Sequence, residues 1–172
     1  MYLKKVIRKR QSVRSFTNDD VDDKLIKKLL SFANLAPSAG NLQAREFIVI
    51  KNEKVKKILY NATFAQNAIL SAPVDIVVCS NLKRIASYGK RGEDLYCIQD
   101  AAAAIENLLL SVVNEGLSAC WIGAFKEDKV KKILNIPSHV RPVAIIPIGF
   151  PDEKNKKTSR IDIEKITHIE RW

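Results

Sequence analysis

The segment from residue 93 to residue 115, EDLYCIQDAAAAIENLLLSVVNE, constrains the fold more than any other part of the chain. Its apolar residues recur at helical spacing and extend around much of the helix circumference. A helix that is apolar on most sides must be covered on most sides, so other elements have to pack around it. Gly116 follows where helices commonly end in a left-handed residue. We therefore expect one long central helix inside a layered domain.

Apolar runs on either side of this helix predict the strands of a small sheet. A strand at 46–50 contains FIVI, and VDIVVCS (74–80), which follows Pro73, is apolar enough for a strand buried on both faces. LSACWIGAF (117–125) predicts a strand that turns into a loop. VRPVAIIPIGF (140–150) predicts the last strand, and its two prolines indicate an edge position or an interruption, because proline cannot donate to a ladder.

The remaining segments divide into helices, loops and a tail. The polar residues from Thr17 to Asp23 are suited to opening a helix, and Pro37 ends that helix. Residues 82–92 are polar, and we expect them to be irregular. Helices are predicted at residues 2–10, 25–36, 53–61, 64–70 and 127–134.

The alternation of strands and helices predicts an α/β chain arranged as an α+β sandwich around a small, mostly buried sheet. Its 172 residues fit a single domain, and 47% hydrophobic residues are enough to form one core. Residues 151–172 are mostly polar and too few for a core of their own. We expect this tail to be an extended arm that wraps a partner subunit.

The chain is basic, with a formal net charge of +10. Such a balance suggests an anionic partner, which can be nucleic acid, an acidic membrane surface or a phosphorylated ligand. Much of the excess lies in lysine pairs such as Lys27 with Lys28 and Lys131 with Lys132, which are typical of solvated helix surfaces. Net charge alone therefore leaves the kind of partner open.

Cys79, Cys97 and Cys120 are widely spaced in apolar surroundings, which predicts small core residues rather than a disulfide framework or a zinc site. With 2 histidines in the chain, we expect no histidine-based metal site. The N-terminus is charged from Lys4 onward and lacks the apolar region of a signal peptide. No run of about 18 apolar residues predicts a membrane span. We expect a cytoplasmic protein.

Arg10, Ser12 and Arg14 alternate within RQSVR. In an extended segment alternate residues project to one side, which would place two guanidinium groups and a hydroxyl together. Arginine binds phosphate through planar, two-pronged hydrogen bonding. An anion site, a solvated charged surface and a nucleic-acid patch that includes Arg8 and Lys9 remain open. No interleaved aromatic residues support stacking on bases.

Two further motifs suit a flat ligand. PSAGNLQ (37–43) combines small residues with side chains that both donate and accept hydrogen bonds, although it would also serve as a plain connecting loop. CWIGAF (120–125) lies where a strand is predicted to end, a common place for ligands in α/β folds. Gly123 permits close approach of its backbone, and its amide can donate to a ring nitrogen. The alternative is a strand end that turns into a helix.

Common catalytic arrangements are missing from the sequence. It contains neither a GxxxxGK[ST] phosphate loop nor a GxGxxG after a strand. With His139 and His168 alone, no serine–histidine–aspartate or cysteine–histidine set is plausible. An enzyme with so few acid–base residues needs a cofactor to carry its chemistry.

Taken in order, these segments resemble the FMN-dependent nitroreductase family. The resemblance rests on RQSVRSF, LAPSAGNLQAREFIVI, the long helix ending in GLSACWIGAF, and VRPVAIIPIGFPDE followed by a late arginine. It extends from Lys4 to Trp172, and residues 88–110 further resemble short members of anaerobes and archaea. It implies a nitroreductase-like fold with a small central mixed sheet flanked by helices. It also implies a homodimer with FMN sites at the interface and C-terminal arms exchanged between subunits.

The resemblance assigns roles to residues by position. Arg10, Ser12 and the late Arg160 would bind the phosphate and ribityl end of FMN. Arg14 would lie at the pyrimidine edge of the flavin, near N1 and O2, where a cation stabilises the reduced, anionic ring.

Other residues would surround the flavin ring. Trp121, Ile122 and Gly123 would cover one face, with a backbone amide near N5, and Gln66 would reach the ring edge. The loop of the other subunit would line the flavin with five residues: Pro37, Ser38, Ala39, Asn41 and Gln43.

The implied activity is ping-pong transfer of hydride from NADH or NADPH, through FMN, to an organic acceptor such as a nitroaromatic, a quinone or a flavin. The sequence departs from the family in having no inserted helical excursion, Ala44-Arg45 where many members have Pro-Trp, and Ile122 where the best-known members have Glu. These departures leave the acceptor open. Alternatives are reductive dehalogenation or flavin fragmentation in the same fold, or a non-enzymatic basic protein that binds anions or nucleic acid. We expect neither nucleic acid nor a membrane as a partner.

Overall fold

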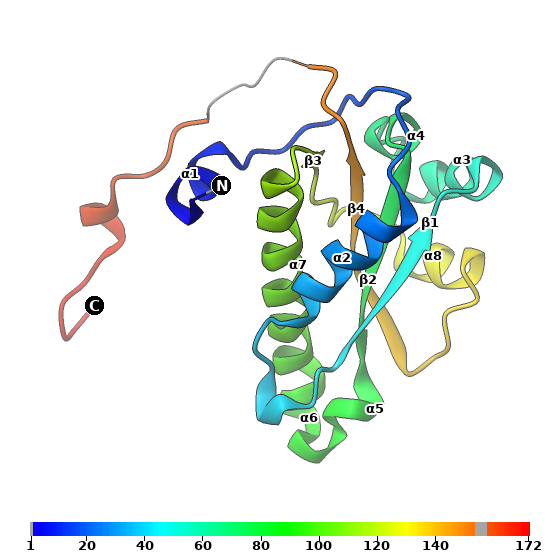
Figure 1. The fold of residues 1–172 in the computed structure, drawn as a ribbon. Coiled ribbons are helices and arrows are strands. Elements are labelled where there is room, and N and C mark those ends of the chain that lie inside the picture. The colour runs from blue at the N-terminus through cyan, green and yellow to red at the C-terminus, as the bar shows by residue number, and fades with distance from the viewer. Residues whose placement is uncertain (1, 154–157) are drawn as a thin grey trace.

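The computed structural model describes residues 2–153 and 158–172, and a four-stranded sheet lies at its centre (Figure 1). The strands are β1 (Arg45–Ile50), β2 (Val74–Asn81), β3 (Ser118–Ala119) and β4 (Val140–Gly149). Their order in the sheet is β1-β2-β4-β3, and every neighbouring pair is antiparallel. Within the described residues, the only parallel pairing is an isolated bridge between Ser12 and Ala119, so the expected mixture of directions is confined to that bridge.

The two inner strands match the sequence patterns in different degrees. All residues of β2 are buried, which confirms the strand buried on both faces. The two prolines of β4 do not place it at an edge, because β4 lies between β2 and β3. The interruption is confirmed, since the register shifts between Val78 and Cys79, where Cys79 pairs with Pro142. A bulge at this point lets the sheet accommodate a residue that has no N–H to donate.

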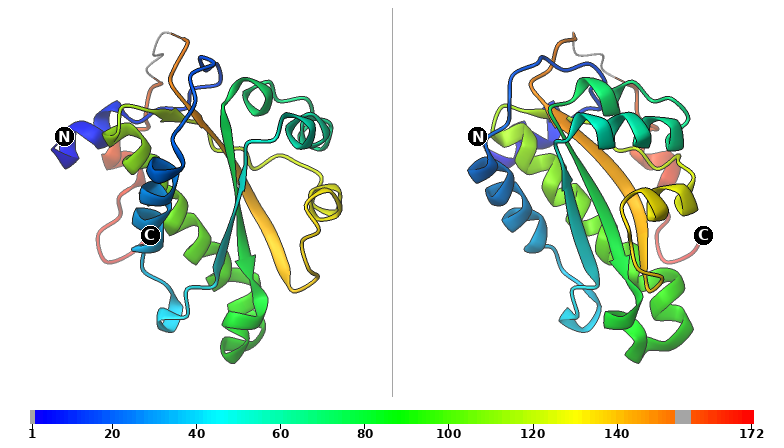
Figure 2. Two further views of the ribbon diagram at one scale, coloured as in Figure 1. Left: turned by 45° about the vertical axis from the view of Figure 1, so that its right-hand side comes forward. Right: turned by 90° about the vertical axis from the view of Figure 1, so that its right-hand side faces the viewer.

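Helices cover both faces of the sheet, which confirms the α+β sandwich (Figure 2). On one face lie α2 (Asp23–Asn34) and α7 (Cys97–Asn114). On the other lie α3 (Glu53–Ala62), α4 (Ala68–Ser71) and α8 (Glu127–Ile133). The predicted central helix is α7, which ends before Gly116, a residue with a φ of 83°.

Residues 82–92 are helical, so the expectation of irregular structure is wrong. The Asn81 side chain accepts a hydrogen bond from the Arg84 amide at 3.3 Å, and this cap starts a helix whose polar residues face solvent. The stretch consists of α5 (Leu82–Ile85), a 3₁₀ turn (Ala86–Tyr88), α6 (Gly89–Arg91) and a π turn (Gly92–Tyr96), and runs directly into α7.

Among the described residues, the helical stretch Leu82–Asn114 is long and apolar enough to cross a membrane by length and composition, since an 18-residue window within it has a mean hydropathy of 1.2. Half of that window is buried inside the domain. Its inward residues, such as Ile105 and Leu108, pack against the sheet. The position of α7 in the core accounts for this apolarity.

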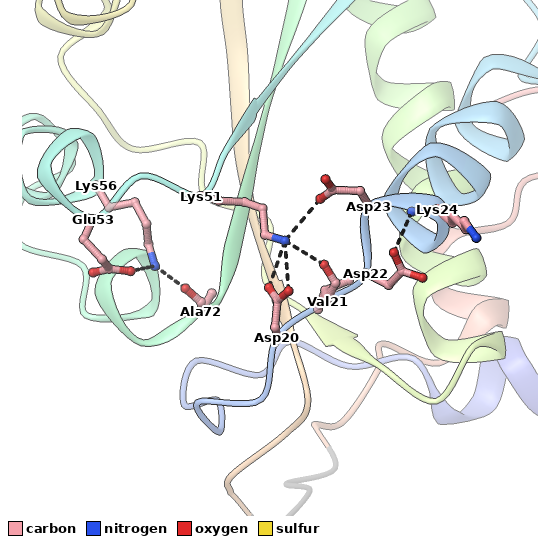
Figure 3. A network of polar contacts seen from close by, with 9 residues as sticks. All are labelled: Asp20, Val21, Asp22, Asp23, Lys24, Lys51, Glu53, Lys56 and Ala72. Carbon is pink, nitrogen blue, oxygen red and sulfur yellow. Dashed lines mark hydrogen bonds and ion pairs between the residues drawn. The ribbon is translucent and has the colours of Figure 1, made fainter.

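One lysine ties the start of α2 to the end of β1, and another ties the start of α3 to the segment between α4 and β2 (Figure 3). Lys51, just after β1, donates to the Val21 carbonyl at 2.9 Å and pairs with Asp20 at 2.8 Å. The Lys51 hydrogen bond holds the pKa of Asp20 below its ordinary value. Lys56 is buried and donates to Glu53 at 3.2 Å and to the Ala72 carbonyl.

A buried carboxyl group lies close to Lys56. Asp75 is fully buried in β2, and within the described structure neither of its carboxyl oxygens has a hydrogen-bond partner. Burial raises the pKa of Asp75 well above its ordinary value, while the Lys56 charge opposes that rise. Asp75 therefore favours its neutral form inside the fold.

The C-terminal arm, residues 158–172, lies apart from the body of the domain (Figure 1). A short 3₁₀ turn, Ile163–Ile166, is its only regular element in the described residues. Every described residue of the arm is exposed, including the large apolar side chains of Ile163, Ile169 and Trp172. An arm with this much exposed apolar surface has not buried it against its own chain.

Candidate functional site

Residues 10–14, which we call the arginine segment, run from the end of α1 (Leu3–Lys9) along β3. The Val13 amide donates to the Ala119 carbonyl at 3.1 Å, and the Val13 side chain is fully buried. Ser12 and Arg14 are exposed on the opposite side, as the alternation predicts, and Arg10 is half-buried. One surface therefore presents a hydroxyl between two arginines.

Cys120 lies beneath this surface. Burial raises the pKa of the Cys120 thiol, the charge of Arg14 and a hydrogen bond with Ser12 lower it, and the charge of Glu153 raises it. Glu153 also accepts a hydrogen bond from the Arg14 amide at 2.6 Å. Ser12 and Arg14 therefore lie near Cys120, the residue that begins the CWIGAF motif.

The CWIGAF motif extends the arginine segment's surface along the edge of β4. Ile122 exchanges two backbone hydrogen bonds of 2.9 Å with Ile145, and its side chain is buried. Trp121 and Gly123 on either side of it are exposed. A Cβ atom on Gly123 would have nothing within 4 Å, so the space beside this backbone is open. Ile122 thus anchors the motif while its two neighbours face solvent.

Gln66 reaches the same strand end from the loop after α3. Its amide nitrogen donates to the Ala124 carbonyl at 3.3 Å. The Lys126 amide donates to the Ala62 carbonyl at 2.8 Å, which fixes the two loops together. The structure therefore brings Gln66 close to Gly123, as the sequence assignment requires.

The loop 37–43 has a defined shape of its own. Asn41 and Gln43 adopt positive φ values of 55° and 51°. The Gln43 amide donates to the Ser38 hydroxyl at 3.0 Å, and the Ala39 amide donates to the Asp100 carboxylate at 2.9 Å. These bonds fix the loop against the beginning of α7.

One chain does not bring this loop to the arginine segment. The loop is attached to Asp100 near the start of α7, whereas the arginine segment runs beside Ala119, beyond its end. At 1.5 Å per residue, the part of α7 from Asp100 to Asn114 alone spans about 21 Å. No residue of the arginine segment lines the cavity of about 370 Å³ beside the loop or the cavity of about 380 Å³ beside Gly123, and both cavities lie at the start of α7, next to Gln99 and Ile98 respectively.

Arg160 is also apart from the other site residues. It lies on the arm, where its guanidinium donates to Thr158 and to the Ser159 carbonyl. Ser12 and Arg14 therefore lie by Cys120, and Gln66 lies by Ala124 at the other end of the same motif. The loop 37–43 lies at the start of α7, and Arg160 lies on the arm.

The three cysteines are buried and free, which confirms them as core residues. Burial raises the pKa of Cys79 to about 12. In the part of the chain that the structure describes, no group of three His, Cys, Asp or Glu side chains is arranged to hold a metal ion.

Residues 7–71 and 60–150 match the model of the nitroreductase family. The chain belongs to the nitroreductase family. It is 35% identical over 176 residues to an Archaeoglobus fulgidus protein named "Putative NADH dehydrogenase/NAD(P)H nitroreductase", with 98% of this chain and 97% of that protein covered. A solved nitroreductase family protein from Clostridium novyi NT is 34% identical, with a TM-score of 0.82 over 89% of this chain and 87% of the other. The structure of B. megaterium NfrA2 shares the fold at 24% identity, with a TM-score of 0.92 over 100% of this chain and 76% of the other.

Sequence reasoning alone misses two buried charges beside the loop of this nitroreductase. Arg45 is 3% exposed, and Asp100 is 4% exposed. Burial lowers the pKa of Arg45, and the Asp100 charge opposes that change. The sequence gives one sign that Arg45 is unusual, because many family members have tryptophan at this position of the motif. The groups that Arg45 binds could be recognised only from the fold.

Proposed function

We propose that this nitroreductase is an FMN-dependent enzyme that takes hydride from NADH or NADPH and passes electrons to an organic acceptor with ping-pong kinetics. The observation that carries the proposal is that Ser12 and Arg14 interact with Cys120 and that the same motif continues, three residues further on, to open backbone at Gly123. The name of the A. fulgidus relative, which includes both NADH and NAD(P)H, supports a nicotinamide donor.

The residues of this surface fit FMN by their chemistry. Arg10 and Ser12 offer charged and neutral donors for a phosphate, with Arg160 of an arm as a further cation. Arg14 is exposed, and at the pyrimidine edge of FMN its charge would stabilise the reduced, anionic ring. The open space at Gly123 lets a flat ring approach the backbone.

Trp121 and Gln66 complete the surface. Trp121 is 39% exposed, so part of its indole is free to cover a ring face. The Gln66 amide lies at the rim, bonded to Ala124. Ile122 contributes by anchoring Trp121 and Gly123 to β4.

Bound FMN would supply the hydride chemistry, and the protein would supply binding, orientation and electrostatics. No side chain on this surface is required as a nucleophile. We propose that Arg14 stabilises the reduced cofactor electrostatically and that solvent protonates the product.

We further propose that the protein is a cytoplasmic homodimer whose sites are shared between subunits. The support is the separation within one chain of the arginine segment from the loop that contains Pro37, Ser38, Ala39, Asn41 and Gln43. A two-fold axis brings the loop of each subunit to the arginine segment of the other. The exposed arm would then bury its apolar side chains on the partner.

An absorbance spectrum of the purified protein from about 300 to 550 nm tests the cofactor, because bound flavin is yellow. Titration of the apo-protein with FMN measures the affinity. Arg10→Ala and Arg160→Ala should each weaken binding by about 2–3 kcal/mol. Arg8→Ala, an exposed arginine on α1, is the matched control. A colourless protein that instead shifts nucleic acid in a salt-dependent manner would refute the proposal.

A further inference from the structure

Arg45 holds the backbone that leads into the loop 37–43. Its guanidinium donates to the Asn34 carbonyl at 2.6 Å, to the Ala36 carbonyl at 2.9 Å and to the Pro37 carbonyl at 3.3 Å. A fourth bond, from Nε to the Asn34 side chain, measures 3.2 Å. A side chain from β1 therefore binds the last carbonyl group of α2 and two carbonyl groups of the backbone that follows it.

Asp100 fixes the same loop from the opposite side. One carboxylate oxygen accepts the Ala39 amide at 2.9 Å, and within the described residues the other oxygen has no hydrogen-bond partner. Arg45 and Asp100 interact electrostatically inside the fold. A buried arginine that binds carbonyl groups and a buried aspartate that binds an amide complement each other in charge and in hydrogen bonding.

We propose that Arg45 and Asp100 are positioning residues, which set the shape of the loop 37–43 and through it the cofactor site of the partner subunit. This inference rests on the proposed function, in which that loop lines the FMN of the other subunit. Neither residue lies on the surface of the arginine segment. They act through Pro37, Ser38 and Ala39, which form one wall of the cavity of about 370 Å³ beside α7.

The chemistry of arginine explains why this residue suits the position. A guanidinium has five N–H groups in a fixed plane and can bind several carbonyl groups at once. Tryptophan, which many family members have here, donates one hydrogen bond at most. In this chain the loop is therefore held by directed bonds, whereas an indole at this position would hold it mainly by packing.

Conservative variants separate positioning from folding. Arg45→Lys keeps the charge but loses the planar arrangement, so we expect FMN affinity to fall about tenfold to a hundredfold. Arg45→Met should lower the FMN affinity further. Asp100→Asn retains an acceptor for the Ala39 amide, so it should lower the FMN affinity less than Asp100→Leu does. Lys83→Met, an exposed lysine on α5, is the control and should bind FMN like the wild type.

The decisive measurement is the FMN content of mixed dimers. An Arg10→Ala chain and an Arg45→Met chain are co-expressed with different affinity tags, and the heterodimer is isolated through both tags. If Arg45 acts across the interface, one site receives an intact arginine segment from the Arg45→Met chain and an intact loop from the Arg10→Ala chain. We expect each homodimer to be depleted of FMN and the heterodimer to regain about one FMN per dimer.

Two other results have distinct meanings. A heterodimer as depleted as the homodimers would overturn the inference, because Arg45 would then act within its own subunit or through general stability. Unchanged FMN affinity in Arg45→Lys and Asp100→Asn, at unchanged thermal stability, would overturn it as well. A wild-type protein without FMN would instead refute the proposed function, and the inference with it.

Discussion

Removal of residues 161–172 should abolish dimerisation at micromolar concentration, because the arm exposes its apolar side chains in the single chain. Ile163 is 68% exposed, Ile169 is 86% exposed and Trp172 is fully exposed, and Ile161 and Ile166 are more than half exposed. Burying one such side chain contributes about 1.5–3 kcal/mol. Weighted by exposure, the five side chains of one arm contribute at most about 6–11 kcal/mol.

This contribution is large compared with the cost of association. Bringing two chains together costs about 4–15 kcal/mol, and a two-fold dimer gains the contribution of both arms. Loss of even about 6 kcal/mol raises the dissociation constant of the dimer by more than about four powers of ten. The truncated chain should therefore be monomeric and, because its site is incomplete, free of FMN.

Analytical ultracentrifugation across a range of concentrations, with FMN absorbance recorded in the same run, tests this expectation. Ile163→Ser should weaken the dimer in part, and Glu164→Ser, an exposed neighbour in the same turn, should not. A truncated chain that remains dimeric at micromolar concentration with stoichiometric FMN would refute the reasoning, since the arm would then contribute little to the interface.

Arg14→Ala should lower the midpoint potential of bound FMN by about 30 mV for each 1.4 kcal/mol of lost stabilisation of the reduced form, and Arg14→Lys should keep part of the effect. A redox titration at fixed pH measures this, and an unchanged potential would limit Arg14 to a phosphate or structural role. Leu108→Ala should lower the free energy of unfolding by about 2–5 kcal/mol, because Leu108 is fully buried between α7 and the sheet. A loss below about 1 kcal/mol in urea denaturation would contradict that packing. Since the pKa of Asp75 is raised in the fold, its contribution to stability is complete below the ordinary pKa of aspartate and is lost as pH rises through the raised pKa. Asp75→Asn should therefore unfold with a weaker pH dependence in urea, and an unchanged slope between acidic and alkaline pH would show that Asp75 does not titrate in this way.

The sequence predicts the elements of this fold well where one local pattern decides them. The helical period of α7 and the continuous apolar run of β2 each follow from the burial of one element on most sides. The helical structure of residues 82–92 was harder to predict, because their polar composition obscures a helix that begins at the Asn81 cap. The position of β4 inside the sheet depends on its pairing with β3, a strand of two residues at the start of the predicted 117–125 segment, and no local pattern shows which strands pair.

The candidate site was predictable to a similar degree. Alternation alone predicts that Ser12 and Arg14 face the same side, and the structure confirms it. The partners of Arg45 lie 8 to 11 residues away in the sequence, and Asp100 belongs to another element. Whether a charge is buried depends on such contacts, so the sequence alone did not reveal these two residues.

In the proposed dimer, the separation of the arginine segment from the loop 37–43 within one chain gives dimerisation a role beyond stability. The buried core surrounds α7 and both faces of the sheet, and the arm contributes nothing to that core within the chain. Variants in the core and variants in the arm should therefore lower FMN content for different reasons. A core variant such as Leu108→Ala reduces the free energy of unfolding and, through it, FMN content, whereas an arm variant removes FMN from a chain whose own fold is intact. Under this arrangement FMN binding reports on the interface, and the arm links assembly of the dimer to completion of its two sites.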